Sequence, residues 1–233
     1  MNIRLDNTQL VLFSPGIIIV DKLKVANAIN NILSGLFDGD PIILPLPEDA
    51  PPEIPRIKMG SKDGRYNLSI AKSRLDFIFK YEEDKRENLF PIPGLFEKFL
   101  TIFQYLKENI YTQITRTATV TNWIIELENP AAEFLLSKYI RSETPIIKPY
   151  ELELHYLTKE SIAGFDVNKW TRIKSARKIS KPEQNRFISF LIDINTLAEM
   201  TYEFNKESLQ RLLDESSKII KGAVEKHFKN MGG

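Results

Sequence analysis

The sequence contains no cysteine and only two histidines among its 233 residues. The absence of cysteine excludes disulfides, thiolate metal sites, iron–sulfur ligation and cysteine catalysis. A serine–histidine pair would have to use His155 or His227, and no G-x-S-x-G motif is present to supply a nucleophile. We expect His227 to be a cationic side chain at the C-terminal end of an amphipathic helix, a position that favours positive charge. These absences favour a protein that is not an enzyme.

Membrane segments and phosphate loops are also missing from the sequence. The longest apolar run, 16–20, is far shorter than the roughly 18 residues that a membrane helix needs. The first residues lack the charged, apolar and small-residue order of a signal peptide. The ten glycines are scattered, and none belongs to a G-x-G-x-x-G or G-x-x-x-x-G-K motif. We therefore expect a cytoplasmic protein with no cofactor and no membrane contact.

Neither sign of charge dominates the composition. The chain has 32 lysines and arginines against 31 aspartates and glutamates, which gives a formal net charge of +1. This balance excludes a strongly basic protein but allows a local basic patch. Hydrophobic residues make up 42% of the chain and charged residues 27%, values typical of globular rather than disordered proteins. A chain of this length can bury a core as one domain or as two small ones.

The first half of the chain alternates between strand and helix patterns. An apolar stretch over 10–20, with a bend at Ser14-Pro15-Gly16, predicts a strand, and Asp21 is a suitable N-cap for the helix that follows. Six prolines and five acidic residues predict a stiff acidic loop over 38–55. Period-two alternation around a hairpin turn at Asp63-Gly64 predicts a meander of three strands. A helix with an aromatic stripe comes next.

The second half repeats this order of elements. A long strand over 114–127 precedes a short helix that begins at Pro130. A second meander and a final amphipathic helix follow. The three strands of this meander are predicted over 150–158, 167–179 and 187–194, and the last helix is capped by Asn205 or Ser208. From the order of elements alone we infer a structural duplication.

These patterns predict an α+β fold in which antiparallel sheet is covered by helices. We divide the chain into two similar strand–helix–three-strand–helix halves. Residues 1–111 contain the acidic proline-rich loop, and residues 112–233 end in the C-terminal helix. Each half leaves one apolar sheet face to cover. The halves can close the core as one continuous sheet or as two sheets packed on shared helices, and both arrangements fit the sequence.

One group of residues is a weak candidate for a metal site. Glu151, Glu153 and His155 are two residues apart in a predicted strand, so their side chains project from one face. A divalent cation could bind there if a neighbouring carboxylate joined them. The simpler interpretation is that these residues form the solvated side of a strand whose other side is buried. We therefore predict that no metal is bound.

A basic segment over 167–181 contains cations and one tryptophan but no acidic residue. The candidate residues for binding nucleic acid or a partner are Lys169, Trp170, Arg172, Lys174, Arg177 and Lys178. Strand alternation places Trp170 and the even-numbered cations on one face, where they could hold a phosphate backbone with stacked bases. Two other interpretations stay open. The segment could be an internal or intersubunit charge partner of the acidic loop, or its lysines could protect a sheet edge from aggregation.

Several segments show a resemblance to a known group of proteins. They are Pro55-Arg56-Ile57, Asp63–Ser69 with Arg74-Leu75, the run from Phe96 to Asn122, Asp193-Ile194-Asn195, and Val224–Phe228. Together these segments resemble a sporadically distributed family of uncharacterised prokaryotic proteins of about this length. The proline-rich stretch 41–55 departs from the family pattern. The resemblance implies no established activity, and the family's patchy distribution resembles that of mobile or defence-associated genes.

The sequence thus favours a non-enzymatic protein-interaction or assembly subunit of a prokaryotic accessory complex, such as a defence complex. Its partner would be a co-encoded protein or a second copy of the chain. The first alternative is a nucleic-acid-binding subunit that uses the basic strand 167–181. The second is a metal-dependent enzyme built on the weak candidate site.

Overall fold

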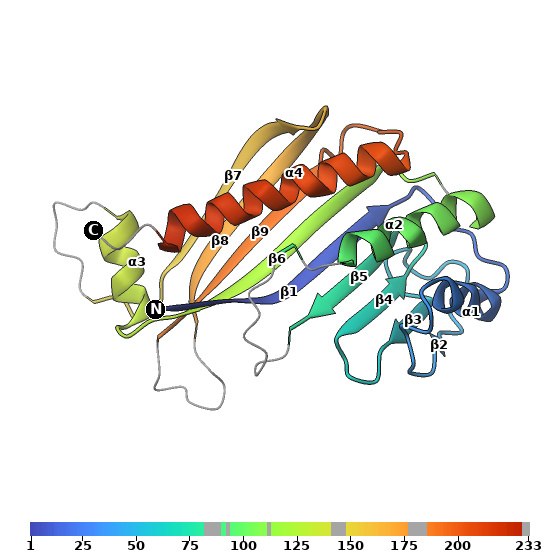
Figure 1. Cartoon of the computed structure of the whole chain (residues 1–233), viewed down its shortest axis with the longest axis horizontal. Helices are drawn as coiled ribbons and strands as arrows, with labels where there is room; N and C mark the ends of the chain where they lie inside the picture. Colours follow the sequence, from blue (N-terminus) through green and yellow to red (C-terminus); the bar gives the residue numbers. More distant parts are fainter. Residues whose placement is uncertain (82–89, 92–93, 111–112, 141–147, 177–185, 230–233) are drawn as a thin grey trace.

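The computed structural model describes the chain except for residues 82–89, 92–93, 111–112, 141–147, 177–185 and 230–233 (Figure 1). In the described residues it contains one antiparallel sheet of nine strands and four α-helices. The predicted α+β class, with antiparallel sheet covered by helices, is confirmed. None of the helices in the described ranges is long and apolar enough to span a membrane.

The nine strands form a single continuous sheet. In chain order they are β1 (Asn2–Phe13), β2 (Ile42–Ile43), β3 (Ile57–Gly60), β4 (Tyr66–Ile70), β5 (Arg74–Lys80), β6 (Arg116–Glu126), β7 (Glu153–Ile162), β8 (Phe165–Ala176) and β9 (Phe187–Thr196). Their order across the sheet is β2-β3-β4-β5-β1-β6-β9-β8-β7. Because β1 pairs with β5 on one side and with β6 on the other, the two halves of the chain join at the centre. Of the two arrangements open to the sequence, the continuous sheet is the one observed.

The four α-helices begin where their sequences supply caps or prolines. They are α1 (Lys22–Ile32), α2 (Leu95–Tyr105), α3 (Ala131–Tyr139) and α4 (Lys206–Val224), and short π-helical turns at Leu106–Ile110 and Glu225–Lys229 extend α2 and α4. The Asp21 side chain accepts a hydrogen bond from the backbone N–H of Lys24. Asn205 and Ser208 form a reciprocal capping box at the start of α4. The predicted caps of both helices are confirmed.

The two halves follow the same order of elements. In each, a long strand is followed by a helix, a meander and a second helix, and the last strand of the meander pairs with the first strand of that half. The first half adds the two-residue strand β2, which lies within the predicted loop 38–55. The predicted boundary between 111 and 112 falls outside the described residues. A duplication stays a prediction that rests on this shared order.

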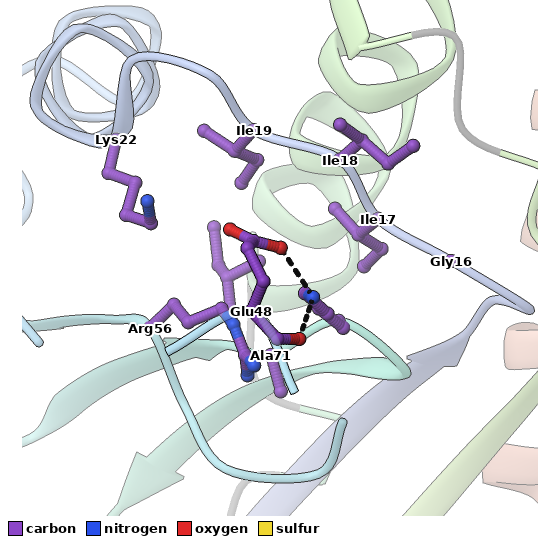
Figure 2. A pocket seen from close by; sticks show the side chains of 10 residues that line it. Gly16, Ile17, Ile18, Ile19, Lys22, Glu48, Arg56 and Ala71 are labelled. Atoms are coloured by element: carbon purple, nitrogen blue, oxygen red, sulfur yellow. Dashed lines mark hydrogen bonds and ion pairs between the residues drawn. The ribbon is translucent and has the colours of Figure 1, made fainter. Parts of the chain in front are cut away.

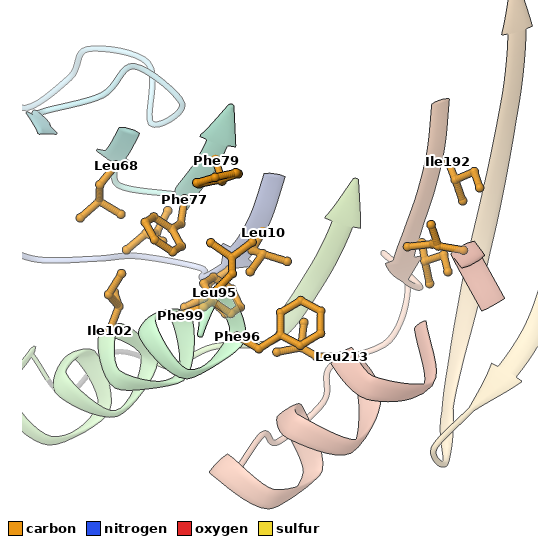
Figure 3. Packing of buried hydrophobic residues seen from close by; sticks show 14 of the residues in the cluster. Leu10, Leu68, Phe77, Phe79, Leu95, Phe96, Phe99, Ile102, Ile192 and Leu213 are labelled. Carbon is orange, nitrogen blue, oxygen red and sulfur yellow. The ribbon is translucent and has the colours of Figure 1, made fainter. Parts of the chain in front are cut away.

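The core lies between one face of the sheet and the helices (Figure 3). Leu10 of β1 and Phe77 of β5 project from the sheet toward Phe99 and Ile102 of α2, and all four side chains are at most 1% exposed. Ile192 of β9 and Leu213 of α4 belong to the same cluster. The apolar stripe of α2 and the alternating pattern of the meander therefore bury one common layer, as their spacing predicted.

Strand ends differ from the predicted ones where local sequence gave a weak signal. The first strand was predicted over 10–20 but runs from Asn2 to Phe13, because Ser14-Pro15-Gly16 ends it instead of bending it. The strand predicted over 150–158 runs from Glu153 to Ile162. A turn at Ala163-Gly164, with φ of 51° and 86°, then leads into β8. This turn lacks the Asn-Gly or Asp-Gly pair that usually marks a hairpin. The predicted strand therefore ends at 158, four residues before the observed end.

Candidate functional site: the open face of the sheet

The helices pack against one face of the sheet (Figure 1). In the described part of the chain no helix packs against the other face, which we call the open face. Strand alternation and register assign its residues. In the central strands they include Gln9, Val11 and Phe13 of β1, Arg74 and Asp76 of β5, Arg116, Ala118 and Val120 of β6, Leu191, Asp193 and Asn195 of β9, and Trp170, Arg172 and Lys174 of β8.

A groove of about 390 Å³ lies at the centre of the open face. Its lining comes from five adjacent strands and consists of Gln9, Val11, Phe13, Arg74, Arg116, Ala118, Val120, Arg172, Leu191, Asp193 and Asn195. Three arginines, each from a different strand, face this groove, while Asp193 is its one acidic lining residue. The groove is therefore suited to an anionic ligand.

Two of these arginines are held by an aromatic ring. Phe13 of β1 pairs in register with Arg74 of β5 on one side and with Arg116 of β6 on the other. The guanidinium of Arg116 lies 4.7 Å from the Phe13 ring centroid and that of Arg74 lies 5.4 Å from it. Arg116 also donates to the backbone carbonyl of Thr196, and Arg74 forms an ion pair with Asp76. These contacts orient both cations over the sheet instead of leaving them free in solvent.

A tryptophan and a carboxylate lie directly beside each other at the β8 side of the groove. Trp170 of β8 is the register partner of Asp193 of β9. The Asp193 carboxylate accepts a hydrogen bond of 3.0 Å from the Asn195 side chain. Burial raises the pKa of Asp193 above its ordinary value, although this hydrogen bond and the nearby Arg172 and Arg116 act in the opposite direction. Burial therefore disfavours the charged form of the Asp193 carboxyl itself, whereas the two arginines favour negative charge beside them.

The basic strand lies partly on this face. Trp170, Arg172 and Lys174 are on the open face, as their alternation predicted, and Lys174 pairs with Glu153 at 3.5 Å. Lys169 is on the helix-covered face and forms an ion pair with Glu160, so it lies apart from the other described members of the predicted binding set. The predicted members Arg177 and Lys178 lie outside the described residues.

Within one chain, the two other interpretations of the basic strand do not fit the topology. The acidic loop contains β2, at the edge of the sheet opposite to β7 and β8, and its Glu48 pairs with Lys72. The described part of the basic strand is therefore too distant to be its charge partner within one chain. β8 has neighbours on both sides, so its cations do not protect an edge. On this side of the sheet the edge strand is β7.

The weak metal candidate is not assembled. Glu153 and His155 project from the open face of β7, but Glu151 precedes the strand. Glu153 pairs with Lys174, and the His155 ring lies 5.6 Å from the Trp170 ring. Within the described ranges no three His, Asp or Glu side chains are grouped so that they could hold a metal ion.

Sequence reasoning did not identify four groove residues, Phe13, Arg74, Arg116 and Asp193. Each is a single polar or aromatic residue on the solvated side of an alternating strand, which is unremarkable in its own segment. Their importance comes from strand order, since β5, β1, β6 and β9 are adjacent only in the folded sheet. The usable signal was that central strands carried arginine on the face away from the core.

His227 differs from its predicted environment. Its Nδ1 atom lies 2.8 Å from the Tyr139 hydroxyl and its Nε2 atom lies 3.1 Å from the Tyr156 hydroxyl. The ring also packs against Phe190. Burial, followed by the charge of Lys138, lowers the pKa of His227, so the predicted cationic side chain is wrong. It links α3, β7 and the end of α4 on the helix-covered side.

A scan against protein-family models and a search of the curated proteins find no match for this chain. The resemblance to a prokaryotic family, which rests on short segments, therefore stays a prediction. Function has to be argued from the open face itself.

Proposed function

We propose that this protein is a non-enzymatic binding subunit that holds a single-stranded nucleic acid on the open face of its sheet. The observation that carries the proposal is the convergence of Arg74, Arg116 and Arg172 on one groove with Trp170 at its side. Arginine binds phosphate oxygens through a planar fork of donors. Trp170 offers a ring on which a base can stack.

A single strand fits this surface better than a duplex does. Bases in a duplex are stacked on each other, whereas unpaired bases can be splayed onto aromatic side chains. The groove spans five strands, so its cations follow a path across the sheet instead of forming one point of charge. The backbone would follow the arginines, and one base would lie over Trp170.

Fluorescence anisotropy with labelled single-stranded DNA and RNA tests this proposal. Binding should weaken with salt because each neutralised phosphate releases counterions. Four cations, the three arginines and Lys174, imply a log–log slope of roughly −2 to −3. Trp170→Ala should weaken binding by about 1 to 3 kcal/mol if a base stacks there.

Charge reversal supplies the matched control. Arg172→Glu with Lys174→Glu changes two cations of the open face and should abolish binding without unfolding the protein. Arg211→Glu changes an exposed cation of α4, on the helix-covered side, and should leave binding unchanged. No binding of either nucleic acid at low salt would refute the proposal.

A second candidate function is assembly through the edge strand β7, in line with the interaction role that the missing catalytic motifs, the charged segments and the sheet edges favour. β7 is ten residues long and has a neighbour on one side only among the described strands. Tyr156 and Leu157 are both 39% exposed there. Such an edge can pair with the same edge of a second copy across a twofold axis. A chain that is monomeric at high concentration and pairs with no co-encoded protein would exclude this candidate.

A further inference from the structure

A second hollow, of about 240 Å³ (Figure 2), lies beside the turn between β4 and β5, strands that are separated from β7 by the centre of the sheet. It is enclosed by the segment Gly16–Ile19, the start of α1, the acidic loop and the turn between β4 and β5. The backbone N–H of Ile17 donates to the carbonyl of Lys72 at 2.7 Å, which fixes the first of these segments against the turn. The walls of the pocket are thus tied together.

Three cations from three segments line this pocket, Lys22 of α1, Arg56 before β3 and Lys72 of the turn. Arg56 is only 8% exposed. Its guanidinium donates to the backbone carbonyls of Ile54 at 2.7 Å and Ala50 at 3.2 Å. Arg56 therefore shapes the end of the acidic loop as well as contributing charge to the pocket.

The single carboxylate among the lining residues is that of Glu48. The Lys72 ammonium donates to both the Glu48 carboxylate and the Glu48 backbone carbonyl at 2.6 Å, and dashed lines mark these bonds in Figure 2. The hydrogen bond from Lys72, then its charge, lowers the pKa of Glu48. The Glu48 side chain is nevertheless 88% exposed, so it reaches the cations from the solvent side of the pocket.

The remaining wall is apolar. Ile17 and Ile70 are at most 3% exposed and close its inner side, whereas Ile18 is 80% exposed at the rim. An exposed isoleucine beside a cationic pocket offers a contact for the apolar body of a ligand whose charged group lies deeper.

We propose that this pocket binds a phosphate monoester and that Glu48 is an internal stand-in that occupies the anion position when no ligand is bound. Three cations face one carboxylate, so the pocket retains an excess of positive charge. A phosphate monoester carries about −1.5 to −2 charges at neutral pH and three strong acceptor oxygens. It therefore matches the three donors better than a single carboxylate does, and an attached apolar group would lie on Ile18.

The phosphate could belong to a free small molecule or to the 5′ end of a nucleic-acid strand. Lys72 of the pocket and Arg74 of the groove are separated by one residue. A nucleic-acid strand bound in the groove could therefore place its 5′ phosphate in the pocket, which makes a strand end one of the two sources. The residues that form the monoester site are separate from the open face, so the site does not depend on the function proposed for that face.

Calorimetric titration of the full chain with phenyl phosphate and with inorganic phosphate tests the proposal. Phenyl phosphate should bind more tightly than inorganic phosphate because its ring contacts the apolar rim. Glu48→Gln should tighten binding about tenfold, the size of one charge-assisted hydrogen bond that no longer competes. Asp49→Asn changes the neighbouring acidic residue, which does not line the pocket, and should have no such effect. Lys72→Gln should weaken binding about tenfold or more.

The outcome that overturns the proposal is a Glu48→Gln variant that binds phenyl phosphate no more tightly than the unchanged chain, or no binding by either protein at millimolar ligand. Because this substitution removes an exposed charge, it does not threaten folding. Matched oligonucleotides with a 5′ phosphate or a 5′ hydroxyl then identify the source. A preference for the phosphorylated strand that grows in Glu48→Gln assigns the site to a strand end, and equal binding assigns it to a small molecule.

Discussion

Arg74 and Arg116 approach the same ring, that of Phe13, from the two strands on either side of it. Their guanidinium carbons lie 5.4 Å and 4.7 Å from the ring centroid. Since all three residues are register partners across β5, β1 and β6, the spacing between the two charges is set by the sheet. A fixed pair of cations over an aromatic ring loses less entropy on binding phosphate than two mobile lysines would.

Replacement of Phe13 tests whether this ring positions the arginines. Phe13→Leu keeps an apolar side chain but removes both cation–π contacts, each worth about 0.5 to 1 kcal/mol at an exposed site. We expect affinity for a single strand to fall about three- to tenfold, as measured by anisotropy. Phe13→Tyr retains the ring and should bind as the unchanged chain does. Equal affinity of the leucine variant would show that the ring has no positioning role.

Replacing Asp193 with asparagine should raise both the stability of the protein and its affinity for a single strand. Burial raises the pKa of its carboxyl. At a pH above this raised pKa, the charged carboxylate lowers the free energy of unfolding. This loss of stability disappears once the pH is below the unfolded pKa, because the carboxyl is then protonated in both states. Asp193→Asn keeps an oxygen that can accept from Asn195. It should therefore raise the free energy of unfolding at neutral pH, with a smaller gain at acid pH, and also tighten binding of a single strand. Urea unfolding at several pH values measures the first effect, and weaker binding by the variant would contradict the second.

His227 predicts a loss of stability on mild acidification. Burial lowers its pKa below the ordinary value of 6.5. A histidine with a lowered folded pKa contributes stability that is fully present above the unfolded pKa and is lost as the pH falls through it. We expect the free energy of unfolding to decrease as the pH falls through 6.5 toward the lowered folded pKa, and to decrease less in His227→Gln. His155→Gln removes the other histidine and should retain the full decrease.

The edge strand gives a paired test of assembly. Ser175 donates its backbone N–H to the Leu152 carbonyl, so in β7 the even-numbered residues bond to β8 and the N–H of Leu157 points away from the sheet. If β7 pairs with a second copy, Leu157→Pro should leave the fold intact and produce monomers in light scattering. Tyr156→Pro would instead break the β7–β8 ladder and lower stability. Dimers that persist in Leu157→Pro would place the contact elsewhere.

The cap of α4 gives a prediction about stability alone. The Asn205 side-chain oxygen accepts a hydrogen bond of 2.7 Å from the Ser208 backbone N–H. The Ser208 hydroxyl accepts one of 3.0 Å from the Asn205 backbone N–H. Asn205→Ala should lower the free energy of unfolding by about 1 kcal/mol. A thermal or urea denaturation series that includes Ser208→Ala measures the two reciprocal bonds separately. No loss in either variant would mean that the start of α4 frays in solution.

Much of the fold followed from local sequence. The cap at Asp21, the turn at Asp63-Gly64 and the apolar stripe of α2 each depend on residues within a few positions of one another. Such signals are carried by backbone dihedral preferences and by side-chain periodicity, which a single sequence displays. The α+β class and the faces of Trp170, Arg172 and Lys174 could therefore be predicted.

The candidate sites depended on distances that no local signal records. Phe13, Arg74, Arg116 and Asp193 come from four strands whose adjacency is set by long-range pairing, and Glu48 reaches Lys72 across 24 residues. His227 was expected to be cationic from its place on a helix, but its burial and the nearby Lys138 lower its pKa. The sequence by itself determined which side chains could carry charge, stack or cap. Only the tertiary structure decided which of them meet, because strand order and burial arise from packing the whole sheet against its helices.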